Sequence, residues 1–159
     1  HPVWIAAFNG QRTTVEWLTV VAGAGADAVN ESKYGQSALH VAAGNDHPGC
    51  VAALLEAGPN IEAKTMEGYT ALHWSAIQGN DPCLKLLLEA GAKIEAKSNS
   101  GWTALHCSAS NGNDPCLKLL LEAGANIEAK DNDGGTPLDD AKSEGHTACI
   151  ALLEAAGAR

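Results

Sequence analysis

The stretches Gly68-Tyr-Thr-Ala-Leu-His73 and Gly101-Trp-Thr-Ala-Leu-His106 decide the fold of this 159-residue chain. They begin 33 residues apart, and related stretches, starting at Gly35 and Gly134, keep the same interval on either side. Thirty-three residues is the length of one helix–turn–helix unit with its loop. The chain is therefore predicted to be a stack of similar units, and not a globule around a single enclosed active site.

Other landmarks repeat in step with these stretches. Leucine pairs recur at Leu54-Leu55, Leu87-Leu88 and Leu120-Leu121, and the fourteen residues 79–92 recur unchanged as 112–125. A more diverged unit precedes residue 35, with Pro2-Val3-Trp4-Ile5-Ala6-Ala7 in place of the opening stretch and Gly25 in place of Gly58. From Gly10 to Gly25 this unit has three residues more than its counterparts, which predicts a longer second helix or a longer preceding turn.

The repeated stretches resemble the ankyrin repeat, whose signature is Thr-Pro-Leu-His-x-Ala-Ala. The resemblance covers the whole chain as one domain, 1–159, of five repeats at about 1–34, 35–67, 68–100, 101–133 and 134–159. It implies an all-α fold, an α-solenoid of stacked helix–turn–helix repeats joined by β-turn loop tips. It also implies structural roles for the repeated glycines and for the histidines, which bond the backbone of the adjacent loop; these residues are Gly35, Gly68, Gly101, Gly134, His40, His73 and His106.

Each unit shows two short helical patterns. In the first, small residues such as Ala71, Ser75 and Ala76 share one helical face, which permits close approach to neighbours. The second follows Asn80-Asp81-Pro82, where we expect Asp81 to be the N-cap, and ends at Gly91. Slim inner helices and bulky outer helices predict a stack that curves toward the inner row, with a concave face made of inner helices and loop tips.

The two ends of the array differ. In the last unit Asp139, Lys142 and Glu154 replace residues that are apolar or buried elsewhere, as a terminal cap requires. In the first unit Val3, Trp4, Ile5, Trp17 and Leu18 stay apolar. Because the sequence also opens at His1 without Met, we expect a fragment or processed product, with further chain upstream covering that face.

Composition excludes several classes of protein. The net charge of −9 and a pI near 5.0 disfavour a nucleic-acid partner, and no apolar run is long enough for membrane insertion. Four cysteines, Cys50, Cys83, Cys116 and Cys149, occupy one column, and neighbouring helices about 8–10 Å apart are too distant for a disulfide or a shared zinc ion. Unpaired, buried thiols predict an intracellular, cytoplasmic protein.

No set of residues amounts to a catalytic constellation, so we expect no enzyme activity, metal or cofactor. The histidine column could suggest a metal site, but its spacing prevents neighbours from sharing an ion. Asp139-Asp140 near His146 could suggest an acid–base pair, but their place in the capping repeat favours a solvated polar end. Glu62, Glu95 and Glu128 form an acidic column that we interpret as a solvated edge.

The resemblance implies that partner proteins bind the concave face through positions that vary among repeats. Counted from each glycine, these are the two residues before it and those one, six, nine and ten after it. Tyr34, Tyr69, Trp74 and Trp102 are the aromatic residues after residue 30, and all occupy such positions. The predicted partner-binding residues are Tyr34, Gln36, Val41, Met66, Glu67, Tyr69, Trp74, Ile77, Gln78, Trp102, Cys107 and Asn111. Alternatively, the rings lie flat over loop backbone and stabilise the stack.

Two functions are compatible with this sequence. The first is a non-catalytic interaction module that binds a neutral to basic protein or peptide, steered by a rim of Glu67, Glu95, Asp133 and Glu144. The alternative is the partner-recruiting arm of a larger enzyme or effector. A rigid spacer is disfavoured by the aromatic residues, and self-association through the same patch stays possible but is not predicted.

Overall fold

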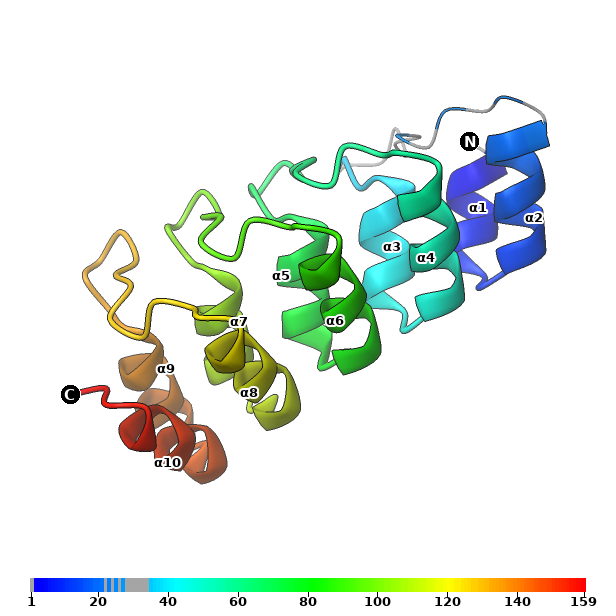
Figure 1. Ribbon diagram of the computed structural model, residues 1–159. Coiled ribbons are helices and arrows are strands. Elements are labelled where there is room, and N and C mark those ends of the chain that lie inside the picture. The colour runs from blue at the N-terminus through cyan, green and yellow to red at the C-terminus, as the bar shows by residue number, and fades with distance from the viewer. Residues whose placement is uncertain (1, 22, 24, 26, 28–34) are drawn as a thin grey trace.

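Ten α-helices pair into five helical hairpins in the residues that the computed structural model describes, which are 2–21, 23, 25, 27 and 35–159. The hairpins stand side by side in a row from the N-terminus to the C-terminus, with the loop tips projecting on one side (Figure 1). These described ranges contain no β-strand, and the predicted all-α solenoid is confirmed. The inner helices are α1 (Pro2–Phe8), α3 (Ala38–Gly44), α5 (Ala71–Gln78), α7 (Ala104–Ser110) and α9 (Pro137–Glu144), and the outer helices are α2 (Arg12–Glu16), α4 (Pro48–Glu56), α6 (Asp81–Glu89), α8 (Asp114–Glu122) and α10 (Thr147–Ala155).

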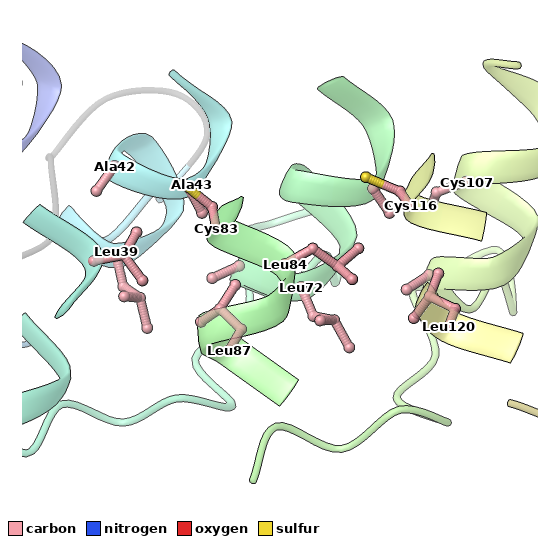
Figure 2. Packing of buried hydrophobic residues seen from close by; sticks show 14 of the residues in the cluster. Leu39, Ala42, Ala43, Leu72, Cys83, Leu84, Leu87, Cys107, Cys116 and Leu120 are labelled. Carbon is pink, nitrogen blue, oxygen red and sulfur yellow. The ribbon is translucent and has the colours of Figure 1, made fainter. Parts of the chain in front are cut away.

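The core is a continuous apolar layer that runs along the row of hairpins. Inner helices contribute one leucine and small residues, such as Leu72 with Ala71 and Ala76, while outer helices contribute paired leucines such as Leu84 and Leu87. Figure 2 shows this alternation across neighbouring repeats. Because each hairpin is apolar on both flanks, it is stabilised by its neighbours and not by a core of its own.

Buried imidazoles connect each inner helix to the next loop tip. His73 accepts hydrogen bonds at Nδ1 from the Thr70 backbone N–H (3.1 Å) and pairs with the Thr70 hydroxyl (2.8 Å). With Nδ1 an acceptor, Nε2 carries the proton and donates to the Trp102 carbonyl 29 residues away (3.0 Å). His40 and His106 make equivalent bonds to the carbonyls of Tyr69 and Gly135, the kind of loop contact that the resemblance implied for these histidines.

The repeated glycines adopt positive φ, and Gly35, Gly68 and Gly101 lie against the loop tip that precedes the next repeated glycine. The φ angles of Gly68 and Gly101 are 81° and 84°, in the region that other residues rarely adopt. A Cβ atom on Gly101 would also lie 2.7 Å from the backbone nitrogen of Asn132. Gly35 and Gly134 have positive φ as well.

The acidic column lies at an exposed edge, with Glu95 and Glu128 exposed and Glu62 half-buried, and it also makes contacts between repeats that the sequence did not indicate. Glu62 accepts a hydrogen bond from the backbone N–H of Lys93, and Glu95 and Glu128 accept from residues 31 positions further on. A backbone N–H left free in each loop explains why a carboxylate is useful there. Lys64 and Lys97 form a parallel series, each donating to the carbonyl of the lysine 33 residues later.

The first repeat is longer than the others because a π-helical turn extends its outer helix. Trp17–Val21 continues α2 as a π-helix, which accommodates one inserted residue. The glycine with positive φ after this helix is Gly23, so Gly23 and not Gly25 corresponds to Gly58. The other two additional residues fall between Gly23 and Gly35, mostly outside the described residues.

The start of the outer helices also differs from the prediction. Helix α6 begins at Asp81 with Asn80 as its N-cap, so Asp81 is a first-turn residue and not the cap. The Asn80 side chain makes no capping bond and instead donates to the Ala43 carbonyl in the preceding repeat at 2.8 Å. Asn113 binds the Ala76 and Ile77 carbonyls in the same way, so the N-cap residue connects two repeats.

The last repeat has the polar exterior expected of a cap. Asp139 is exposed, and Lys142 on α9 pairs with Glu154 on α10 at 3.7 Å. All five cysteines are free and buried, as predicted for the column of four. Burial raises the pKa of Cys83 and of Cys116 to about 12, so these thiols are protonated at neutral pH and act as small apolar residues.

We expect His73 to make the stack sensitive to mild acid. Burial lowers the pKa of His73 from 6.5 to about 4. Between these values the unfolded chain binds a proton that the folded chain does not, so stability that is complete above pH 6.5 falls as the pH drops toward 4. When the pH is lowered from about 7.5 to about 5, the free energy of unfolding should fall by about 2 kcal/mol because of His73. Urea denaturation at the two pH values should show a correspondingly smaller loss for His73→Gln, and an equal loss would contradict a buried neutral imidazole.

Candidate functional site

A pocket opens on the inner face, the surface formed by the inner helices and the loop tips. Its volume is about 150 Å³, and side chains from α1, α3 and α5 surround it. Phe8 and Trp74 supply aromatic surface, while Gln36, Asn45 and Gln78 supply amide groups. Among the residues that the structure describes, no ionised side chain lines the pocket, and the lining residues are Phe8, Gln36, His40, Val41, Gly44, Asn45, Trp74 and Gln78.

Trp74 is the central residue of this pocket. Its ring lies over Gly44, where an added Cβ atom would meet ring carbon Cε3 at 3.4 Å. A larger residue at position 44 would therefore compete with the indole for space. The Nε1 atom is buried but has no hydrogen-bond partner. An unsatisfied buried N–H destabilises the folded chain.

Tyr69 and Trp102 lie differently from Trp74. Both are half-buried and pack against the apolar core. Trp102 stacks on His106 with ring centroids 6.4 Å apart, and its Nε1 donates to Asp131 Oδ2 at 3.2 Å. Tyr69 lies 5.6 Å from the His73 ring. For these two residues, the interpretation that the rings cover the loops and stabilise the stack has direct support.

The other predicted residues divide by accessibility. Met66, Glu67, Gln78 and Asn111 are exposed, and Gln36 and Ile77 are half-buried. Val41 and Cys107 are buried, with 4% and 0% of their surfaces exposed. Cys107 is therefore left out of the candidate surface, whereas Val41 lines the pocket with the small part of its side chain that stays exposed. Tyr34 lies outside the described residues.

Phe8 was not among the residues predicted from the sequence. It is 47% exposed and lies opposite Trp74 at the pocket. Its position matches Gly44 and Ile77 in the next two repeats, which are nine residues after their glycines. The variable-position rule would have included Phe8 if it had been applied to the diverged first repeat.

The inner face becomes acidic toward the C-terminal end. Asp140 stands on α9 at the position of Trp74 and Cys107, and its Oδ2 is buried without a partner. Burial, with the neighbouring carboxylates of Asp131, Asp139 and Glu144, raises the pKa of Asp140 to about 6. At neutral pH Asp140 is thus mostly ionised, but its charge is less favourable than that of an exposed carboxylate.

Neither a metal centre nor a membrane span emerges from the described part of the chain. There, no three histidine, cysteine or acidic side chains are grouped so as to hold a metal ion. Among the described helices, none combines the length and the apolar composition that crossing a membrane requires.

Comparison with known proteins agrees with this architecture. A sequence model described as ankyrin repeats (3 copies) matches residues 3–98 and again residues 94–159. The chain belongs to the ankyrin-repeat family. Ankyrin repeats are generally protein–protein interaction modules and are typically non-catalytic. A comparison with curated proteins gives no match.

Matched substitutions in the ankyrin stack should separate the two kinds of tryptophan. Trp102→Phe removes the hydrogen bond to Asp131, whereas Trp74→Phe removes an N–H that has no partner. Both changes remove similar ring surface, so Trp102→Phe should lower the free energy of unfolding by about 1–2 kcal/mol more than Trp74→Phe does. Urea denaturation at neutral pH measures the difference. If the two substitutions lowered the free energy of unfolding equally, the hydrogen bond of the Trp102 indole would not distinguish it from Trp74.

The carboxyl of Asp140 should weaken the ankyrin stack at high pH. The folded pKa of about 6 lies above the ordinary value of 3.8. The carboxyl therefore lowers the free energy of unfolding by its full amount above pH 6 and not at all below about pH 3.8. We expect Asp140→Asn to stabilise the chain by about 1 kcal/mol at pH 8, a value reduced because the carboxyl is partly exposed to solvent. The gain should disappear in denaturation curves at pH 3.5, and a gain independent of pH would exclude this cause.

Proposed function

We propose that this chain is a non-catalytic interaction module that binds a partner protein or peptide on its inner face. The pocket at Trp74 carries the proposal. It is wide enough for one apolar side chain, and it joins aromatic surface to amide groups that suit a peptide backbone.

The partner that we propose is neutral to basic. The chain has a net charge of −9, and Glu67, Asp133 and Glu144 are exposed. A cationic group beside Asp140 would favour the ionised carboxylate and relieve its unfavourable burial. Glu95, which we also expected on this rim, is already hydrogen-bonded to the Asn126 backbone. The same negative charge disfavours nucleic acid as the partner.

We further propose an intracellular setting. All five cysteines are free and buried, and paired cysteines are the rule where the environment is oxidising. The thiols contribute to packing between repeats, so oxidation there would disturb the stack.

Affinity capture from cell lysate, followed by mass spectrometry and affinity measurement, tests the proposal. Trp74→Ala should weaken binding of the captured partner by about 30-fold, because interface tryptophans commonly contribute about 2 kcal/mol or more. Trp17→Ala is the matched control, since Trp17 is 57% exposed but lies on the outer helix of the first repeat. Circular dichroism should show that both variants are folded.

Two further measurements make this test decisive. Binding that depends on Trp74 and weakens as salt is raised supports a basic partner at the inner face. If Trp74→Ala and Trp17→Ala bind the partner as tightly as the parent chain, the inner-face site is wrong. If binding is insensitive to salt, the partner is not basic.

A further inference from the structure

The first repeat exposes positions that later repeats bury. We call this surface the N-terminal face and define it by Ile5, Gln11, Thr14 and Leu18. Ile5 is 53% exposed, whereas its counterparts Val41 and Cys107 are 4% and 0% exposed and its counterparts Trp74 and Asp140 are half-buried. Leu18 is only half-buried, whereas its four counterparts, Leu54, Leu87, Leu120 and Leu153, are fully buried. The apolar residues of this face thus resemble residues that are buried between neighbouring repeats inside the stack.

Hydrogen-bonding groups on this face match those that connect repeats. The N-cap residue of every later outer helix binds a carbonyl near the end of the preceding inner helix, as Asn80 does to Ala43 (2.8 Å) and His146 does to Ser110 (3.0 Å). His47 is placed in the same way near the Phe8 carbonyl (3.1 Å). Gln11 is the N-cap residue of α2 and is exposed. It is an amide donor at a position where every counterpart contacts the repeat before it.

The third residue of each outer helix gives an independent match. Cys116 Sγ points to the Ser75 carbonyl of the preceding repeat at 3.8 Å, and Cys149 Sγ points to the Ser108 carbonyl at 4.0 Å. The third residue of α2 is Thr14, an exposed hydroxyl donor. Thr14 thus matches a contact made in the last two repeats, whereas Cys83 Sγ lies 3.8 Å from Asp46 Oδ1. Gln11 matches a contact made in all four later repeats.

We propose that the N-terminal face docks another ankyrin repeat, in the arrangement that neighbours adopt within this stack. The docking repeat has an apolar C-terminal side and offers the carbonyls at the end of its inner helix to Gln11 and Thr14. This inference goes beyond the proposed function, because the surface lies at the end of the stack and not on the inner face.

A second copy of this chain fits the face poorly. Its C-terminal side carries the exposed pair Lys142 and Glu154, which would be desolvated against Ile5 and Leu18. Two N-terminal faces placed together would leave Gln11 and Thr14 without the inner-helix carbonyls that their counterparts bind. An internal type of repeat supplies both the apolar side and the carbonyls.

The chain itself provides the probe for a test. A copy of residues 68–102, fused directly to residue 1 of the full chain, places an internal repeat before the first one in register. The control fusion carries Ala76→Lys and Leu88→Glu within the copy. These substitutions introduce the residues that the last repeat has at the same positions, Lys142 and Glu154. Hydrogen exchange by mass spectrometry reports on residues 2–19 in the fusions and in the parent.

We expect the apolar copy to slow exchange in residues 2–19 by about tenfold or more relative to the parent, since neighbour contacts stabilise a terminal repeat. The control fusion should give much less protection, and Gln11→Ala in the apolar fusion should remove part of the gain. Equal protection by the two fusions would overturn the proposal. So would sedimentation of the parent chain as a dimer with residues 2–19 protected, because the occupant would then be a second copy.

Discussion

The bond from a buried imidazole to the loop of the next repeat is the constraint on which this structure depends. In the middle of the stack, His73 joins the start of its own helix to the Trp102 carbonyl. The bond requires a neutral ring with the proton on Nε2, and burial keeps the ring neutral. Since the loop tip that receives the bond also carries the side chains of the inner face, the same contact that holds two repeats together positions the candidate site.

Most contacts in the stack are copies of a few patterns. The N-cap residues, the thiol column and the Glu–backbone bonds each recur at intervals of about one repeat. Such a structure gains stability from each pair of neighbours, and every repeat depends on those beside it. The ends are consequently the places where composition must change. The last repeat has the polar pair Lys142 and Glu154, while the first repeat has Ile5 and Leu18.

Tryptophans at variable positions have different roles in this chain. Trp102 has its N–H satisfied by Asp131 and its ring on the core, so it stabilises the loop tip. Trp74 has its N–H unsatisfied and its ring in a pocket. The two tryptophans differ because their rings have different surroundings. Trp102 begins at a loop tip and folds back over the helix, whereas Trp74 starts on an inner helix beside Gly44, where the missing side chain leaves room.

The sequence by itself determined the repeat, the family and the residues that hold neighbouring repeats together, because a 33-residue period and glycines such as Gly101 reflect local backbone requirements. It also indicated where the polar cap lies. Only the tertiary structure decided which variable positions are accessible, since burial of Val41 and Cys107 depends on the adjacent repeats. The same holds for Glu62 and Asn80, whose partners lie in a neighbouring repeat. Periodicity reports what each repeat contains, and the packing between repeats determines what each side chain contacts.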